Sequence, residues 1–293
     1  MKRKLVKQGQ STLMISLPAK WIKENNLSKG SEIDLEIIKG NLHIIPTVKK
    51  EKKKEIRLKL NNLTESAIRT LITNTYRKGY ELVDVEFDNE TQYQVLSKVV
   101  KNKLIGFDIL EKKDKKCVVE NITEPSSEQF ENIMLKVFFN IKELLDITKK
   151  RFSGELDLDY QEVEERIVGY DNFCRRVIAK NNSKNLLWTF LTLINHAQRE
   201  LYHLNKYINK KQSKGAVELL EDCENIFSLI KEAFYKKDLK TIEIVHELEK
   251  RLIYNKGRKL LKKENDPIVI YHIMVSIREF YQSNSPLAGI IME

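Results

Sequence analysis

The strongest constraint on the fold is the spacing of apolar residues after Pro125, which is typical of helices throughout. Polar or glycine-containing breaks divide this region into six segments, at about 127–152, 157–181, 184–211, 214–235, 238–262 and 267–292. An amphipathic helix is stable only when its apolar stripe is covered. More than half of the 293-residue chain is therefore predicted to be a helical bundle.

The six segments fall into two sets of three with matching lengths, which indicates a faint internal duplication. The two repeats cover about residues 125–211 and 214–293. Each repeat ends in a segment with an apolar stripe, formed by Leu187, Leu191, Ile194, Leu201, Leu204 and Ile208 in the first and by Ile268, Tyr271, Val275, Phe280 and Leu287 in the second. This pattern predicts two tandem three-helix bundles that pack together.

Residues 55–122 show a different pattern, in which strands alternate with helices. Four stretches favour strands, namely EIRLKL, LVDVEF, IGFDILEK and KCVVENI. Two stretches favour helices, TESAIRTLITNTYRKGY and NETQYQVLSKVVKN, and the first begins with a capping Thr64 and ends at Gly79. The order β-α-β-α-β-β predicts a small α/β domain whose helices cover a sheet.

The first 47 residues predict a third unit of four short strands and one helix. RKLVKQ and TLMISL flank a turn at Gly9, and the helix AKWIKENN follows Pro18. In EIDLEII the apolar Ile33, Leu35 and Ile37 alternate with acidic residues, and LHIIP returns as the last strand. So few apolar groups make a poor core for a solitary unit. We therefore expect two copies to share their strands in a homodimer.

The net charge of +10 is concentrated at the start of the chain. Residues 1–54 hold 13 Lys and Arg against 5 Asp and Glu, whereas residues 55–293 hold 39 against 37. Half of the excess lies in VKKEKKK (48–54), which is equally well explained as a solvated basic linker. The other half lies in the folded unit before it. An excess confined to one end indicates an anionic partner for that end.

No segment shows the features of an enzyme, a membrane protein or a secreted protein. The chain has no P-loop, G-x-S-x-G or H-E-x-x-H motif, so neither catalytic residues nor a cofactor are predicted. It also has no stretch long and apolar enough to insert into a membrane and no secretory signal. Cys117, Cys174 and Cys223 form no CxxC pair, which favours reduced, buried side chains in a cytoplasmic protein.

Specific motifs in residues 3–46 resemble a known domain family. The basic first strand, the GQST tip, SLPAKWI, the turn LSKGSE and the alternating third strand are similar to SpoVT/AbrB-type swapped-hairpin domains. The whole chain resembles archaeal proteins in which this domain precedes a PhoU-like helical region and which are usually described as phosphate uptake regulators. After residue 125 the resemblance rests mostly on architecture.

The resemblance implies a multidomain α+β fold with three parts. A small swapped-hairpin β-barrel head, dimeric, covers residues 1–47 and is followed by the linker. A small α/β domain covers residues 55–122, and an all-α, PhoU-like domain of tandem three-helix bundles covers residues 123–293.

The resemblance also implies that the head binds double-stranded DNA. In that family two chains interleave their hairpins, and basic side chains on the first hairpin contact the duplex. The matching positions in this chain are Arg3, Lys4, Lys7, Gln10, Ser11 and Lys20. Lysine and arginine neutralise phosphates, and Gln10, Ser11 and Thr12 can hydrogen-bond to phosphates or base edges. Arg3 is the sole arginine of the head and the best candidate for a bidentate contact to guanine.

Metal binding does not follow from the resemblance. Bacterial PhoU proteins hold metal clusters with Glu/Asp-x-x-x-Asp motifs on helices. In this chain Asp171 is followed by Arg175, where the second acid would stand. Likewise, Glu249 of the second repeat is followed by Ile253. The motif is therefore degraded in both repeats, and no metal is predicted there.

One local pattern competes with that conclusion. His196, Glu200 and His203 are spaced i, i+4 and i+7, so they share one face of a helix, a spacing that suits a transition metal. Such a set is more often a group of surface or buried polar residues. His246 and His272 would complete a metal site only if the bundles bring them near.

Together these features predict a cytoplasmic, homodimeric transcriptional regulator that binds DNA through its head. By the resemblance, the rest of the chain relays a signal on phosphate supply through a protein partner in phosphate transport or signalling. The leading alternative is a protein–protein adaptor, antitoxin-like or linked to a transporter, that uses the head mainly for dimerisation. A metal-dependent protein centred on the histidines is a further alternative.

Overall fold

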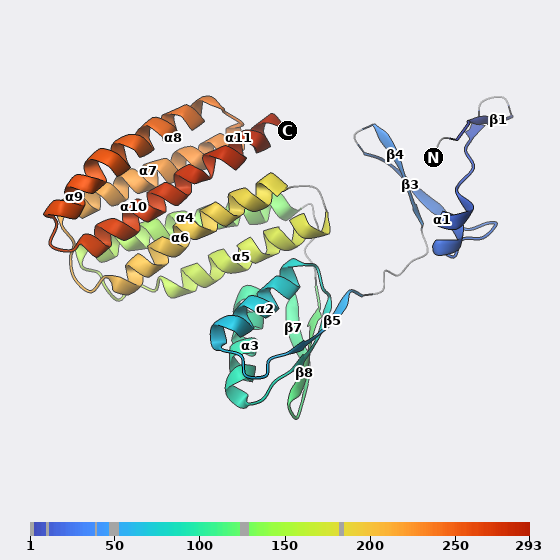
Figure 1. Cartoon of the computed structure of the whole chain (residues 1–293), viewed down its shortest axis with the longest axis horizontal. Helices are drawn as coiled ribbons and strands as arrows, with labels where there is room; N and C mark the ends of the chain where they lie inside the picture. Colours follow the sequence, from blue (N-terminus) through green and yellow to red (C-terminus); the bar gives the residue numbers. More distant parts are fainter. Residues whose placement is uncertain (1–2, 10–11, 39, 47–52, 124–128, 182–184) are drawn as a thin grey trace. The chain divides into compact units, whose positions relative to one another are not determined.

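The computed structural model describes residues 3–9, 12–38, 40–46, 53–123, 129–181 and 185–293 (Figure 1). The chain forms two compact units, unit 1 up to Lys54 and unit 2 from Glu55 to Glu293. The predicted boundary at residue 122 lies inside unit 2 and stays a prediction.

Unit 1 contains the four strands and the helix that the sequence predicts. They are β1 (Val6–Gln8), β2 (Thr12–Met14), α1 (Ala19–Glu24), β3 (Ile33–Ile38) and β4 (Asn41–Pro46). β1 pairs with β2 and β3 with β4, both antiparallel, so unit 1 consists of two hairpins with a short helix between them. No described residue of unit 1 is buried within the single chain, so the part of this unit that the structure describes has no core of its own.

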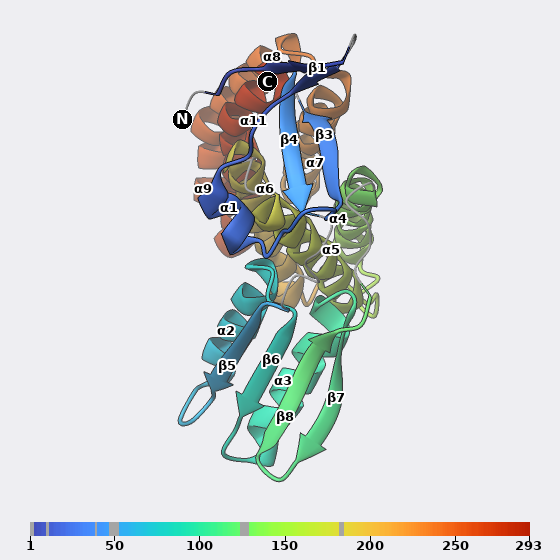
Figure 2. The same ribbon diagram turned by 90° about the vertical axis from the view of Figure 1, so that its right-hand side faces the viewer.

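The first part of unit 2 has the predicted order β-α-β-α-β-β. Its elements are β5 (Glu55–Lys59), α2 (Glu65–Arg77), β6 (Leu82–Glu86), α3 (Glu90–Lys103), β7 (Phe107–Lys113) and β8 (Lys116–Asn121). The strand order is β5-β6-β8-β7, in which β5 and β6 are parallel and the other pairs antiparallel. Helices α2 and α3 cover one face of the sheet, and the described residues of unit 2 leave the opposite face open (Figure 2).

Local sequence signals explain where these elements begin and end. The Thr64 hydroxyl accepts a hydrogen bond from the Ala67 N–H at 3.3 Å and so caps α2. Gly79 ends the turn after α2 with a φ of +80°, a left-handed conformation that favours glycine. Glycine is also required at position 106, since a Cβ there would lie 1.8 Å from the carbonyl oxygen of Thr123.

The second part of unit 2 is helical. Its elements are α4 (Phe130–Ser153), α5 (Gln161–Lys180), α6 (Asn185–Tyr207), α7 (Lys214–Lys236), α8 (Lys240–Lys250), η2 (Arg251–Gly257), α9 (Arg258–Lys263), α10 (Pro267–Gln282) and α11 (Asn284–Met292). They correspond to the six predicted segments, because α8, η2 and α9 follow one another without a break and α11 follows α10 after Ser283. The N-terminal residues of the first predicted helix, 127 and 128, lie outside the described residues.

One apolar core runs through all six helical segments, from Ile133 in α4 to Leu287 in α11. The closing helices of the two predicted repeats, α6 and α10, pack extensively against each other. The sequence did not predict the π-helical segment η2. A Cβ at Gly257 would lie 2.6 Å from the Met274 sulfur, so glycine permits the close approach of η2 to α10. None of the helices described has both the length and the apolar character to cross a membrane.

The three cysteines are free and buried, as the sequence predicts. Burial raises the pKa of the Cys117 thiol to about 11 and that of Cys223 to about 12, and it also raises the pKa of Cys174. Since the thiolate is the reactive form, we expect no rapid reaction with a thiol reagent in the folded protein and three reactive thiols in urea. A thiol titration with and without urea measures this, and fast labelling of the folded chain would contradict it.

Candidate nucleic-acid interface

The first hairpin carries three of the predicted DNA-contact residues. Arg3 and Lys4 precede β1, Lys7 lies within it, and all three are exposed. In the described part of the chain, none of the three forms an ion pair with a carboxylate. Their positive charge is therefore available to an external anion.

Two other residues predicted to contact DNA, Thr12 and Lys20, lie on a different face or element from Lys7. Lys7 is opposite Leu13, whereas Thr12 is opposite Gln8, so Lys7 and Thr12 point to different faces of the hairpin. Lys20 lies on α1, with its Nζ 3.9 Å from a carboxylate oxygen of Glu24. Gln10 and Ser11 lie outside the described residues. The hairpin thus brings Arg3, Lys4 and Lys7 into one segment, and Lys20 belongs to a separate element.

The second hairpin has one face made entirely of apolar side chains. β3 contributes Ile33, Leu35 and Ile37, which stand opposite Pro46, Ile44 and Leu42 of β4. Leu35 is 59% exposed, Ile37 79% and Leu42 58% within the single chain. The opposite face is mixed and carries Asp34, Glu36 and His43 together with Ile45. A continuous apolar face of this kind marks a surface that another molecule covers.

Unit 1 thus has the two hairpins and the short helix that the sequence predicts for a swapped-hairpin head. Residues 6–53 match the family model described as antidote-toxin recognition MazE, bacterial antitoxin. This match, which supports the predicted head, covers less than a fifth of the chain. No curated protein and no solved structure matches the chain. The resemblance of the helical part to PhoU proteins stays a prediction.

The competing histidine pattern comes together only in part. The Glu200 carboxylate is 2.9 Å from Nδ1 of His272 on α10, and the rings of His203 and His272 are 6.4 Å apart. His196 instead lies near Glu279, at 3.8 Å. Burial lowers the pKa of His203, which favours its neutral form. Within the described ranges, no group of three or more histidine, cysteine and carboxylate side chains is arranged to hold a metal ion.

At the degraded PhoU-like motifs, arginine neutralises each remaining acid. Asp171 is 1% exposed, and its carboxylate accepts hydrogen bonds from Arg175 Nε at 2.8 Å and from Arg77 Nη2 at 3.2 Å. In the second repeat, Arg278 pairs with the buried Glu249. In the first repeat, Arg175 thus stands where the bacterial motif would supply a second acid. In the second repeat, Ile253 stands at the corresponding position, and the partner Arg278 comes from α10.

Helix α5 joins the two parts of unit 2, a contact that sequence reasoning missed. The buried Arg176 donates to the carbonyl oxygens of Tyr76 and Tyr80 at 2.7 and 2.8 Å, and its guanidinium lies 5.0 Å from the centroid of the Tyr76 ring. Arg77 of α2 also donates to Asn172 at 2.8 Å. The sequence feature that could have indicated this contact is the pair of adjacent arginines in the otherwise apolar stretch CRRVI.

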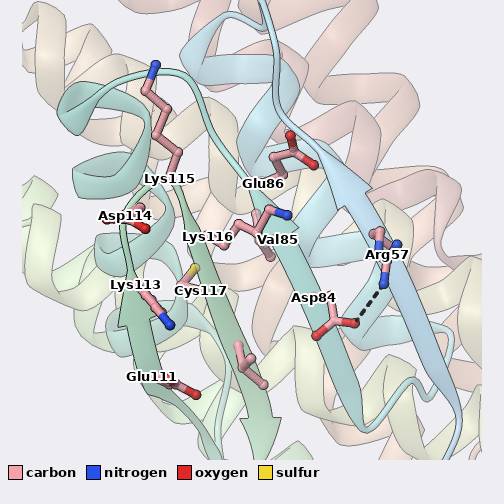
Figure 3. A pocket seen from close by; sticks show the side chains of 11 residues that line it. Arg57, Asp84, Val85, Glu86, Glu111, Lys113, Asp114, Lys115, Lys116 and Cys117 are labelled. Atoms are coloured by element: carbon pink, nitrogen blue, oxygen red, sulfur yellow. Dashed lines mark ion pairs between the residues drawn. The ribbon is translucent and has the colours of Figure 1, made fainter.

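A hollow of about 640 Å³ lies over the open face of the sheet (Figure 3). Arg57 and Asp84, opposite each other on the neighbouring strands β5 and β6, form an ion pair in its lining at 3.9 Å. Basic and acidic side chains mix in its lining, which includes Lys113, Lys116, Glu86 and Glu111. Such a mixture selects no single charge of ligand, so the cationic hairpin remains the stronger candidate for the functional site.

Proposed function

We propose that the chain is a DNA-binding regulator that acts as a homodimer. Unit 1 would hold the duplex, and unit 2 would receive a signal through a partner. One observation carries the proposal. The described part of unit 1 contains both a hairpin whose cationic side chains form no ion pair and a hairpin whose apolar side chains are exposed to solvent. The first supplies phosphate contacts, and the second supplies a reason for two copies to associate.

A second copy of the same chain is the simplest cover for the apolar hairpin. Association through a two-fold axis would bury Leu35, Ile37 and Leu42 of both copies at once. It would also place two cationic hairpins in one assembly, as regulators that bind two DNA half-sites require. The role is one of binding, with no reaction assigned, and its link to phosphate supply rests on the sequence resemblance alone.

The family match favours a second candidate function, an adaptor of the antitoxin kind. The matched family is described by antidote-toxin recognition, and the exposed apolar side chains of unit 1 would suit a protein partner. In this function the head would serve dimerisation and partner binding, and the hairpin cations would contribute little to duplex affinity. Duplex binding therefore separates the two candidates.

The test is to replace Arg3, Lys4 and Lys7 together with alanine. We expect duplex affinity to fall on the order of 100-fold, because each lost phosphate contact removes about 0.9 from the slope of log affinity against log salt. Fluorescence anisotropy with labelled genomic fragments across a salt series measures both quantities. A control with Lys101→Ala, Lys136→Ala and Lys150→Ala removes the same charge from exposed positions of unit 2. Unchanged binding by the head variant would reject the DNA-binding function in favour of the adaptor.

A further inference from the structure

A second concentration of positive charge lies in unit 2, on the segment formed by the end of α8, η2 and α9. Residues 250–263 contain seven lysines and arginines and no acidic residue. Residues 55–293 as a whole have 39 basic and 37 acidic residues, so their net charge is close to zero. Without residues 250–263 the range has 32 basic and 37 acidic residues, so this segment supplies the whole positive excess. We call its outward cations the basic face, defined as Lys250, Arg251, Arg258, Lys259, Lys262 and Lys263.

The exposed positions of this segment repeat every four residues. Lys250, Tyr254, Arg258 and Lys262 form one exposed row, and Arg251, Asn255, Lys259 and Lys263 form the next. In a pure α-helix, residues four apart drift around the axis by about 40° per step, so the rows would turn away from a flat partner. The π-helical segment η2 holds more residues per turn and reduces this drift. It thereby keeps the cations on one side of the helix for about 18 Å.

Two buried or half-buried acids beside the basic face, Glu249 and Asp222, are already neutralised. Arg278 pairs with Glu249, and Lys256 lies 2.5 Å from Asp222. Among the described residues, the only cation of the face with a carboxylate partner is Lys250, which pairs with Glu247 at 3.2 Å. The other five are free of ion pairs, namely Arg251, Arg258, Lys259, Lys262 and Lys263.

We propose that the basic face binds the phosphate backbone of the same DNA duplex that the head holds. This inference rests on the proposed function of unit 1. Because the head and unit 2 belong to one chain, binding of the head raises the local concentration of duplex around unit 2, and a second contact needs little affinity of its own. The basic face would add affinity without sequence preference, since phosphate contacts carry no base information.

The chemistry of the basic face favours DNA over the other anionic surfaces in a cell. Its eight outward positions include no aliphatic side chain, whereas a helix that lies on a membrane buries an apolar face. A stable protein interface likewise needs an apolar or aromatic centre. The one aromatic residue, Tyr254, is engaged within the unit, since its hydroxyl accepts from Arg278 at 3.1 Å and its ring lies 4.8 Å from the Arg258 guanidinium.

The experiment compares full-length variants by the salt dependence of their affinity for a long random-sequence duplex. The basic-face variant carries Arg251→Gln, Lys259→Gln and Lys262→Gln. A matched control carries Lys101→Gln, Lys136→Gln and Lys150→Gln, which removes the same charge from exposed positions elsewhere in unit 2. We expect the basic-face variant to lose about 2 to 3 units of salt slope per protomer and on the order of 100-fold in affinity, and the control to match the unchanged protein.

The head variant with Arg3, Lys4 and Lys7 replaced by alanine separates the two proposals. If it loses binding while the basic-face variant keeps the original slope, unit 1 binds DNA and the basic face does not. If the head variant keeps its affinity while the basic-face variant loses it, the basic face binds DNA and the proposed function of the head is wrong. An unchanged duplex affinity of the basic-face variant, combined with a loss of binding to phosphatidylserine vesicles, would assign the face to a membrane surface and overturn the inference.

Discussion

Replacing Leu35 with aspartate is expected to convert the proposed homodimer into monomers. Leu35 lies at the centre of the apolar face of β3 and β4 and is 59% exposed in the single chain, so the change removes little packing within one copy. In the dimer, each copy would bury an unpaired carboxylate, which costs several kcal/mol. We expect the dimer dissociation constant to rise at least about a thousandfold, a change that sedimentation velocity over a concentration series measures.

The control is His43→Asp, which adds the same charge to the opposite face of the same hairpin, beside Glu36. It should leave the dimer intact. Duplex affinity should fall with Leu35→Asp as well, because two hairpins that bind one duplex as a unit gain a large avidity that separate hairpins lack. A Leu35→Asp protein that sediments as a dimer would show that other residues hold the copies together.

Replacing Asp171 with alanine should give the largest loss of stability of any single charge change in unit 2. Its carboxylate accepts from both Arg175 and Arg77, which would be left without an anionic partner, Arg175 buried and Arg77 largely buried. Burial already lowers the pKa of Arg77, and the charge of Asp171 opposes that shift. Removal of one partner from a buried ion pair typically costs about 3–5 kcal/mol. Urea unfolding followed by far-UV circular dichroism measures the loss.

The matching control is Asp157→Ala, because Asp157 is an exposed aspartate in the connection between α4 and α5. We expect it to change the free energy of unfolding by no more than about 0.5 kcal/mol. If both variants unfolded at the same urea concentration, the buried pair would contribute no net stability. That result would indicate that the hydrogen bonds of Arg176 to the carbonyl oxygens of Tyr76 and Tyr80, rather than the ion pair, hold α5 against α2.

Local signals in the sequence were sufficient to predict most elements of this fold. The alternation of Ile33, Leu35 and Ile37 with acidic residues predicted both a strand and its apolar face. Thr64 and Gly79 predicted the limits of a helix because a cap and a left-handed glycine act through neighbouring residues. The strand order β5-β6-β8-β7 was not predicted, since it depends on contacts between residues far apart in sequence.

The candidate sites were predicted less completely, for two physical reasons. The basic face went unnoticed because a sum of charges over residues 55–293 hides a local excess, and the π-helical segment that aligns it has no simple sequence signal. Arg175 was interpreted only as a missing metal ligand. Its role as the partner of Asp171 became visible when the packing placed Arg77 beside the same carboxylate.

The burial of α5 has a consequence for the evolution of this protein. Residues 171–178 are all buried, and the helix contacts α2 and α3 as well as α4 and α6. A substitution at any of these positions needs a compensating change in at least one neighbouring element, so the segment should diverge more slowly than any exposed stretch. A distant relative should therefore keep an acid and two arginines at the spacing of Asp171, Arg175 and Arg176, together with an arginine at the end of α2, after its surface has become unrecognisable.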